Sequence, residues 1–190
     1  MKSLTSTLTF FIGFVLFMSA CQKTEKRSLA EVEKQELAKG IRNDSLFLGL
    51  AFGMTAKEFY AVCWDLNKKG ILREAAGNTA AAYQLNKGEM NYEAEMDFFP
   101  TYKNEKINVM PVRFHYIGWA PWNEHLQSNK LILEVQKLME KWYGGGFFIT
   151  PLPQGGKGIV KVEGNRKITI TLLSESESEV LVTFTDLTNQ

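Results

Sequence analysis

The sequence contains few of the residues from which catalytic and metal sites are most often built. Two cysteines and two histidines occur among its 190 residues. It has no motif for a nucleophilic serine, a phosphate loop, a dinucleotide site, a zinc protease or a dithiol site. Two glycine-rich stretches, GGGFF and QGGKG, follow a predicted helix or lie between predicted strands, which favours turns. These absences favour a protein that is not an enzyme and that uses no catalytic residues, metal or cofactor.

The sequence also has no excess of charge of either sign. Lysine and arginine number 22, and aspartate and glutamate number 21. Removing residues 1–20 deletes only Lys2, which leaves 21 residues of each sign. Because nucleic-acid binding needs a basic patch, and KTEKR is the one short basic cluster, the charge pattern excludes nucleic acid as a partner.

The apolar run near the N-terminus is too short to cross a bilayer. It covers residues 8–18, LTFFIGFVLFM, whereas a spanning helix needs about 20 apolar residues. Lys2 precedes it, and the small residues Ser19 and Ala20 stand before Cys21. This order is typical of a signal peptide over residues 1–20. A general secretory signal cut elsewhere and an uncleaved anchor are the alternatives.

The stretch FVLFMSACQK resembles the lipobox of bacterial lipoproteins, with Met18 where that family usually has leucine. The resemblance implies cleavage after Ala20 and attachment of diacylglycerol to Cys21, with a further acyl chain such as palmitate on its nitrogen. More than one acyl chain gives stable membrane anchoring. Gln22 resembles the second residue of lipoproteins sorted to the outer membrane, which implies a cell-envelope protein facing the periplasm. Cys63 would then have no partner for an intramolecular disulfide.

Residues 22–43 differ in composition from the rest of the chain. Ten of these 22 residues are charged and none is aromatic. The apolar residues Leu29, Val32 and Leu37 do not continue a stripe of helical period. We therefore expect residues 21–43 to be the lipidated cysteine and a solvated tether, with a docked helix as the alternative. Residues 44–190 are predicted to form a single domain.

Two helices are predicted within this domain. Thr55 and Glu58 form a capping box, and the helix they begin is expected to end near Lys69, before Gly70. Its apolar positions 59, 62, 63 and 66 share one face. A second helix is predicted for residues 129–143, where GGG follows as a stop.

Alternating apolar and polar residues predict several strands. Residues 92–98 and 112–117 each carry one apolar and one polar face, and residues 100–106 are predicted to be the loop between them. Weaker patterns cover residues 71–75 and 79–86. A hairpin is expected around Gly164-Asn165, followed by a strand at 180–187. The predicted fold class is therefore α+β: a two-layer arrangement of antiparallel sheet covered on one face by two helices, in two αβββ-like halves.

Few polar residues form a pattern with chemical meaning. Glu93, Glu95 and Asp97 would lie on one strand face, near Arg113 and His115 if the strands pair. Paired carboxylates can serve catalysis, but a solvated strand face explains the row more simply. A zinc or Cys–His site could combine both histidines with Glu124 and Cys63, but the ligand spacing of such sites is absent, so no metal is expected.

The stretch YIGWAPWNEH, residues 116–125, is the most site-like part of the sequence. Exposed aromatic residues beside polar groups are typical of protein-binding hot spots and small-ligand pockets. Trp119, Trp122, Asn123 and His125 are therefore the candidate partner-binding residues. The alternative is that both tryptophans close the core and Asn123 caps a helical turn.

The stretch FGMTAKEFYAVCWDLNKKG, residues 52–70, resembles the Gly-Met-Thr helix start of small periplasmic lipoproteins. These are the outer-membrane assembly group (SmpA/OmlA, BamE-like) and relatives with folds like the β-lactamase inhibitory protein. The resemblance implies helices against an antiparallel sheet. With the predicted anchor, it favours a non-enzymatic envelope module that binds a protein partner or assists assembly. An envelope hydrolase using His125 with Glu124 or the acidic strand is the alternative.

Overall fold

The structure is a computed structural model that describes residues 28–77, 79–173 and 178–189. Its helices are α1 (Leu29–Ala38), α2 (Ala56–Lys68) and α3 (Ser128–Tyr143), with 3₁₀ turns η1 (Glu124–Leu126) and η2 (Leu187–Asn189). Its strands are β1 (Leu72–Glu74), β2 (Ala81–Leu85), β3 (Ala94–Phe98), β4 (Thr101–Lys103), β5 (Lys106–Tyr116), β6 (Phe148–Pro151), β7 (Lys157–Glu163), β8 (Arg166–Leu172) and β9 (Glu179–Asp186). The predicted cleavage site at Ala20 and lipidation site at Cys21 lie outside the described residues. Within the described part, no helix is long and apolar enough to cross a membrane.

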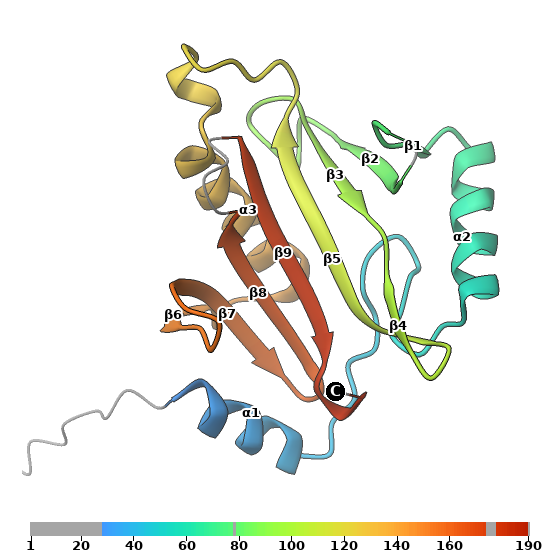
Figure 1. Ribbon diagram of the computed structural model, residues 1–190, viewed down its shortest axis with the longest axis vertical. Coiled ribbons are helices and arrows are strands. Elements are labelled where there is room, and N and C mark those ends of the chain that lie inside the picture. Colours follow the sequence, from blue (N-terminus) through green and yellow to red (C-terminus); the bar gives the residue numbers. More distant parts are fainter. Residues whose placement is uncertain (1–27, 78, 174–177, 190) are drawn as a thin grey trace, which may run out of the picture.

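The strands form one sheet in the order β1-β2-β3-β5-β9-β8-β7-β6, with β4 paired to β5 (Figure 1). All of the pairings are antiparallel. The long strands β5 and β9 join the two halves of the chain at the centre of the sheet. The predicted α+β class is confirmed, and α1 is a third helix beyond the two expected.

The main core lies between the sheet and α3, which runs behind β8 and β9 in Figure 1 and also contacts β5. The alternation predicted for residues 92–98 is confirmed for residues 94–98, where Ala94, Met96 and Phe98 are buried in this core. Tyr92 was expected on the same face, but it lies before β3 and is 46% exposed. Apolar residues of α3 face them at helical spacing: Leu131, Val135, Leu138 and Met139. Burial of these side chains from both elements is the main source of stability for the domain.

Both predicted helices are confirmed within one or two residues. At the start of α2, the hydroxyl of Thr55 accepts a hydrogen bond from the Glu58 backbone N–H, and the Glu58 carboxylate accepts one from the Thr55 N–H. This reciprocal capping box satisfies two backbone donors that the helix itself cannot bond. Gly70 follows the helix with φ +69°, a left-handed conformation that costs glycine little.

Two strands were not predicted. The expected loop at residues 100–106 is instead the tight hairpin β4–β5, whose turn residues Asn104 and Glu105 have φ of 49° and 63°. Positive φ at both central residues is the type I′ geometry that matches the twist of paired strands. The GGGFF stretch leads into β6, which pairs with β7 at the edge of the sheet.

The prediction of a free tether is wrong for its described part, residues 28–43. Helix α1 begins with a capping box between Ser28 and Glu31, and it contacts β7 and η2. Its residues Leu29 and Val32 pack against a second, smaller cluster formed by Val160, Val162 and Leu187. Two apolar residues are enough to dock this helix because one face of β7 presents Val160 and Val162 to it, which the sequence of α1 alone could not reveal.

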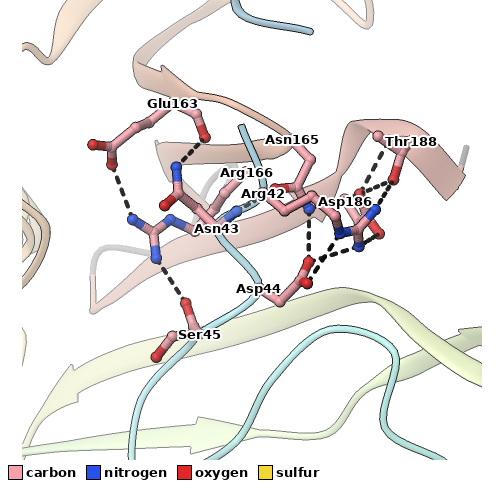
Figure 2. A network of polar contacts seen from close by, with 9 residues as sticks. All are labelled: Arg42, Asn43, Asp44, Ser45, Glu163, Asn165, Arg166, Asp186 and Thr188. Atoms are coloured by element: carbon pink, nitrogen blue, oxygen red, sulfur yellow. Dashed lines mark hydrogen bonds and ion pairs between the residues drawn. The ribbon is translucent and has the colours of Figure 1, made fainter. Parts of the chain in front are cut away.

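A polar network links the chain that follows α1 to the β7–β8 turn and to the end of β9 (Figure 2). We call it the polar clamp and define it by residues of three segments: Arg42, Asn43, Asp44 and Ser45; Glu163, Asn165 and Arg166; Asp186 and Thr188. At its centre Asn165 is 1% exposed. The Asn165 amide nitrogen donates to Asp44 at 2.9 Å and Asp186 at 3.0 Å, while its oxygen accepts from the Asn43 N–H at 2.6 Å.

Arg166 forms the second half of the polar clamp. Its guanidinium donates to the Ser45 carbonyl at 2.7 Å and to the Glu163 carboxylate at 3.0 Å. It also lies over the ring of Tyr143 at the end of α3, 4.7 Å from the ring centroid. The clamp therefore connects residues 42–45, the β7–β8 turn and α3, and buried charges are stable there because each has several partners.

Candidate functional site

A cleft with a volume of about 480 Å³ lies between α2 and the β1 side of the sheet. Its walls are mostly apolar and aromatic, with a few polar groups. The lining residues from α2 include Phe59, Tyr60, Cys63 and Trp64, and Phe99 closes the sheet side. This size and this mixture are typical of sites that bind a ligand or a peptide side chain.

The period of α2 explains why aromatic side chains reach this cleft. Phe59 belongs to the predicted inward stripe and is 2% exposed. Tyr60 and Trp64 lie outside that stripe, one turn apart, and are 55% and 65% exposed. Phe99 is 41% exposed, so three large aromatic side chains gather at one solvent-facing place. An exposed aromatic patch of this kind is typical of an interaction site.

The aromatic rings contact one another and are partly fixed in place. The Phe59 ring lies edge-on to both Tyr60 and Phe99, at centroid distances of 5.6 Å and 5.9 Å. Tyr60 and Phe99 are 6.5 Å apart. The Lys68 amine lies over the Trp64 ring, 5.6 Å from its centroid. These edge-to-face and cation–π contacts reduce the ordering needed when a partner binds.

Cys63 lines the same cleft but is poorly suited to nucleophilic chemistry. Burial raises the pKa of its thiol to about 11, with no other cause acting on it. The thiolate is the reactive form, so this raised pKa leaves the thiol protonated and inert at neutral pH.

The raised pKa gives a prediction for Cys63 reactivity. The full chain carrying Cys21→Ser has a single thiol, Cys63. At pH 8 this thiol is expected to react with a disulfide reagent about 100-fold more slowly in the folded protein than in the denatured protein. Stopped-flow absorbance measures both rates, with guanidinium-denatured protein as the control. Similar rates in the two states would show that the thiol is accessible and not desolvated.

The structure divides the predicted Trp119–His125 site. Trp119 is half-buried and packs against the main core, as the alternative interpretation expected. Trp122, by contrast, is 84% exposed. The Asn123 side chain accepts from the His125 N–H at 3.3 Å and caps η1, and His125 itself is exposed. Trp122 and His125 therefore remain available to a partner, but Trp119 does not.

The predicted strand pairing does bring the acidic row against basic residues. Glu95 pairs with His115 and Asp97 with Arg113 across β3 and β5. The row is less solvated than expected, because Glu95 is 4% exposed and bonded to the Arg73 guanidinium. Burial raises the pKa of the Asp97 carboxyl, against the opposing charges of His115, Arg113 and Arg73.

This cluster does not have the geometry of a catalytic or metal site. Potential ligand atoms of Glu95, Asp97 and His115 lie within 4.8 Å of one another. However, the Arg73 guanidinium already neutralises Glu95, and Arg113 stands opposite Asp97. The His115 ring nitrogens are each 3.8 Å from a carboxylate oxygen, beyond hydrogen-bonding distance. The cluster is an ion network across three strands.

Tyr60, Trp64 and Phe99 are candidate site residues that the sequence motifs do not single out. The available signal was the position of Tyr60 and Trp64 outside the apolar stripe of α2, where large aromatics are not needed for the core. Phe99 gave no such signal, because it follows the apolar face of β3 directly.

Comparisons with protein-family models, with curated proteins and with solved structures find no match to this chain.

Proposed function

We propose that this chain is a lipid-anchored protein of the bacterial cell envelope that acts, without catalysis, by binding a protein partner. Cys21 would carry the lipid, and the domain would face the periplasm from the outer membrane. The observation that carries the binding role is the aromatic cleft beside α2, where Tyr60, Trp64 and Phe99 are exposed together. Aromatic residues of this kind dominate the energetics of protein interfaces.

The architecture supports this role. In the proposed arrangement, α2 with β1–β5 and α3 with β6–β9 are two αβββ-like halves of a two-layer domain, joined where β5 pairs with β9. The cleft lies on the α2 half, and α1 docks on the other half, at β7. A lipid attached before α1 would therefore hold the molecule by the half that does not carry the cleft. The cleft would stay open to a partner in the periplasm.

Site-specific crosslinking in intact cells tests the binding role. A photo-reactive amino acid in place of Trp64 is expected to give a discrete crosslinked protein band, identified by mass spectrometry. The matched control is the same amino acid in place of Leu133, which is 53% exposed on α3 and lies away from the cleft. Equal crosslinking from both positions, or none from position 64, would contradict the proposal.

Metabolic labelling with a fatty-acid analogue tests the anchor separately. The wild-type chain is expected to take up label and to fractionate with membranes, and Cys21→Ser is expected to lose both properties. Cys63→Ser is the matched control and should keep them. Label retained by the Cys21→Ser variant would contradict lipidation at this residue.

A further inference from the structure

The edge of the sheet beside the aromatic cleft has free pairing capacity. β1 is the last strand on its side, and within the described residues it pairs with β2 alone. The Ala75 N–H donates to the Ala80 carbonyl, one step beyond the Glu74–Ala81 pair. Because hydrogen-bonded and non-bonded pairs alternate in an antiparallel ladder, the backbone groups of Leu72 and Glu74 point away from β2.

One contact shows that this outer edge faces α2. The Asn67 side chain, from the last turn of α2, donates to the Leu72 carbonyl at 3.0 Å. The remaining outward groups of the edge are the Leu72 N–H and both backbone groups of Glu74. An open strand edge next to an apolar helix face is the arrangement by which several domains bind an extended peptide as an added strand.

The charges along α2 indicate what kind of peptide fits. Lys57 and Lys68 are exposed at the two ends of the outward stripe that carries Tyr60 and Trp64. Within the described residues, neither lysine forms an ion pair, whereas Lys69 is paired with Asp65 at 2.5 Å. Glu74 is the acidic lining residue, and it belongs to the opposite wall of the cleft. Neither Lys57 nor Lys68 lines the cleft itself. Both stand on the exposed side of α2, beyond Tyr60 and Trp64, where their charges are complementary to carboxylates of a segment that extends past the cleft.

We infer that the cleft binds an extended peptide segment of a partner protein, added to the edge of β1, with an apolar anchor residue flanked by acidic residues. The inference rests on the proposed protein-binding function and names the form of the partner. The anchor would enter between Tyr60, Trp64 and Phe99. Residues two before and two after the anchor share its face of the strand and stand about 13 Å apart.

That spacing suits the two lysines. Lys57 and Lys68 are eleven residues apart on α2, which places them about 16 Å apart along the helix axis. Flexible lysine side chains close the remaining difference. The expected partner motif is therefore an acidic residue, any residue, an aromatic or large aliphatic residue, any residue, and an acidic residue.

A displayed library of random seven-residue peptides, selected against the full-length chain in detergent, tests this inference. We expect enrichment of the motif just given. Trp64→Ala and Tyr60→Ala are each expected to weaken the best selected peptide at least about tenfold, measured by fluorescence anisotropy. Trp122→Ala is the matched control, because it removes an exposed tryptophan outside the cleft, and it should leave affinity unchanged. Failure to enrich the motif, or affinity unchanged by Trp64→Ala, would overturn the inference.

Two further measurements test the charge pairing and the strand addition. Lys68→Glu is expected to weaken binding of the acidic peptide. It is expected to strengthen binding of a peptide that has lysine in place of the acidic residue facing position 68. In an added strand, alternate peptide N–H groups point toward β1 and away from it. N-methylation of the amides that point toward β1 should abolish binding, whereas N-methylation of the amides that point away should not. Tolerance of both sets would overturn strand addition.

The outcomes also separate this inference from other occupants. One alternative is a membrane-docking surface. It would be indicated if no peptide is enriched and if the Cys21→Ser protein floats with phosphatidylglycerol vesicles but loses this flotation when Trp64 is also changed to alanine. If position 64 still crosslinks to a protein in cells while no peptide is enriched, the proposed function stands and the extended-peptide inference is wrong.

Discussion

Gly164→Ala is expected to lower the free energy of unfolding by about 3 kcal/mol, because the new methyl group meets the chain that follows α1. A Cβ at this position would overlap the Ile41 carbonyl oxygen and lie 3.2 Å from the Asn43 amide nitrogen. Backbone atoms cannot move aside as a flexible side chain can. Residue 164 also has φ +58°, a left-handed conformation that alanine adopts at a cost of about 1 kcal/mol.

The expected response is local as well as global. Since Gly164 touches residues 41–43, the polar clamp and the docking of α1 are expected to weaken before the rest of the domain. Chemical denaturation measures the decrease in stability, and hydrogen exchange of α1 amides is expected to accelerate more than exchange in β5 or β9.

Gly70→Ala is the matched control for Gly164→Ala. Its φ is +69°, and a Cβ there would have nothing within 4 Å. It therefore carries the left-handed cost without the collision, and it is expected to lose only about 1 kcal/mol. Equal losses in the two variants would show that the contact with Ile41 is unimportant.

Asn165→Asp is expected to destabilise the protein by about 3 kcal/mol at pH 7 and by much less near pH 4. The two side chains have nearly the same shape. The substitution removes the donor that serves Asp44 and Asp186, and it places a third carboxylate beside them (Figure 2). Asp186 is 4% exposed, so solvent cannot screen the repulsion.

The pH dependence follows from the like charges. Neighbouring carboxylates raise the pKa of the new carboxyl in the folded state above its unfolded value. The folded state then binds the proton more tightly, so stability is highest below the unfolded pKa and is lost as pH rises through the folded pKa. Urea unfolding of wild type and variant at several pH values measures this difference.

Asn129→Asp controls for the substitution itself. Asn129 is exposed in the first turn of α3, where a negative charge interacts favourably with the helix dipole. Its stability is expected to be unchanged or slightly raised at pH 7. A pH-independent loss in Asn165→Asp would mean that shape, and not charge, decides stability at the clamp.

Much of the secondary structure could be predicted because its causes are local. The capping box of Thr55 and Glu58 and the glycine at position 70 mark both ends of α2 within a few residues of sequence. Alternation likewise predicts which side chains of β3 join the apolar core, since successive residues of a strand point to opposite faces. The same alternation placed Glu95 and Asp97 correctly against His115 and Arg113.

The errors concern contacts between segments far apart in the chain. The apolar residues of α1 form no stripe of helical period, so its sequence alone favours a tether. Its docking depends on Val160 and Val162 in β7, more than a hundred residues later. The polar clamp joins residues 42–45 to residues 163–166 and 186–188. No pattern of neighbouring residues in the sequence predicts such a network.

The sequence by itself determined α2, α3, most of the strands and the α+β class, because hydrophobic period and capping act over a few residues. It also carries the predicted lipobox and the absence of common catalytic motifs. Only the tertiary structure decided which aromatic side chains are left exposed. Trp119 packs on the core while Trp64 and Trp122 do not, because burial depends on what the rest of the chain places beside each ring. For the same reason, the cleft between α2 and the edge strand could not be predicted.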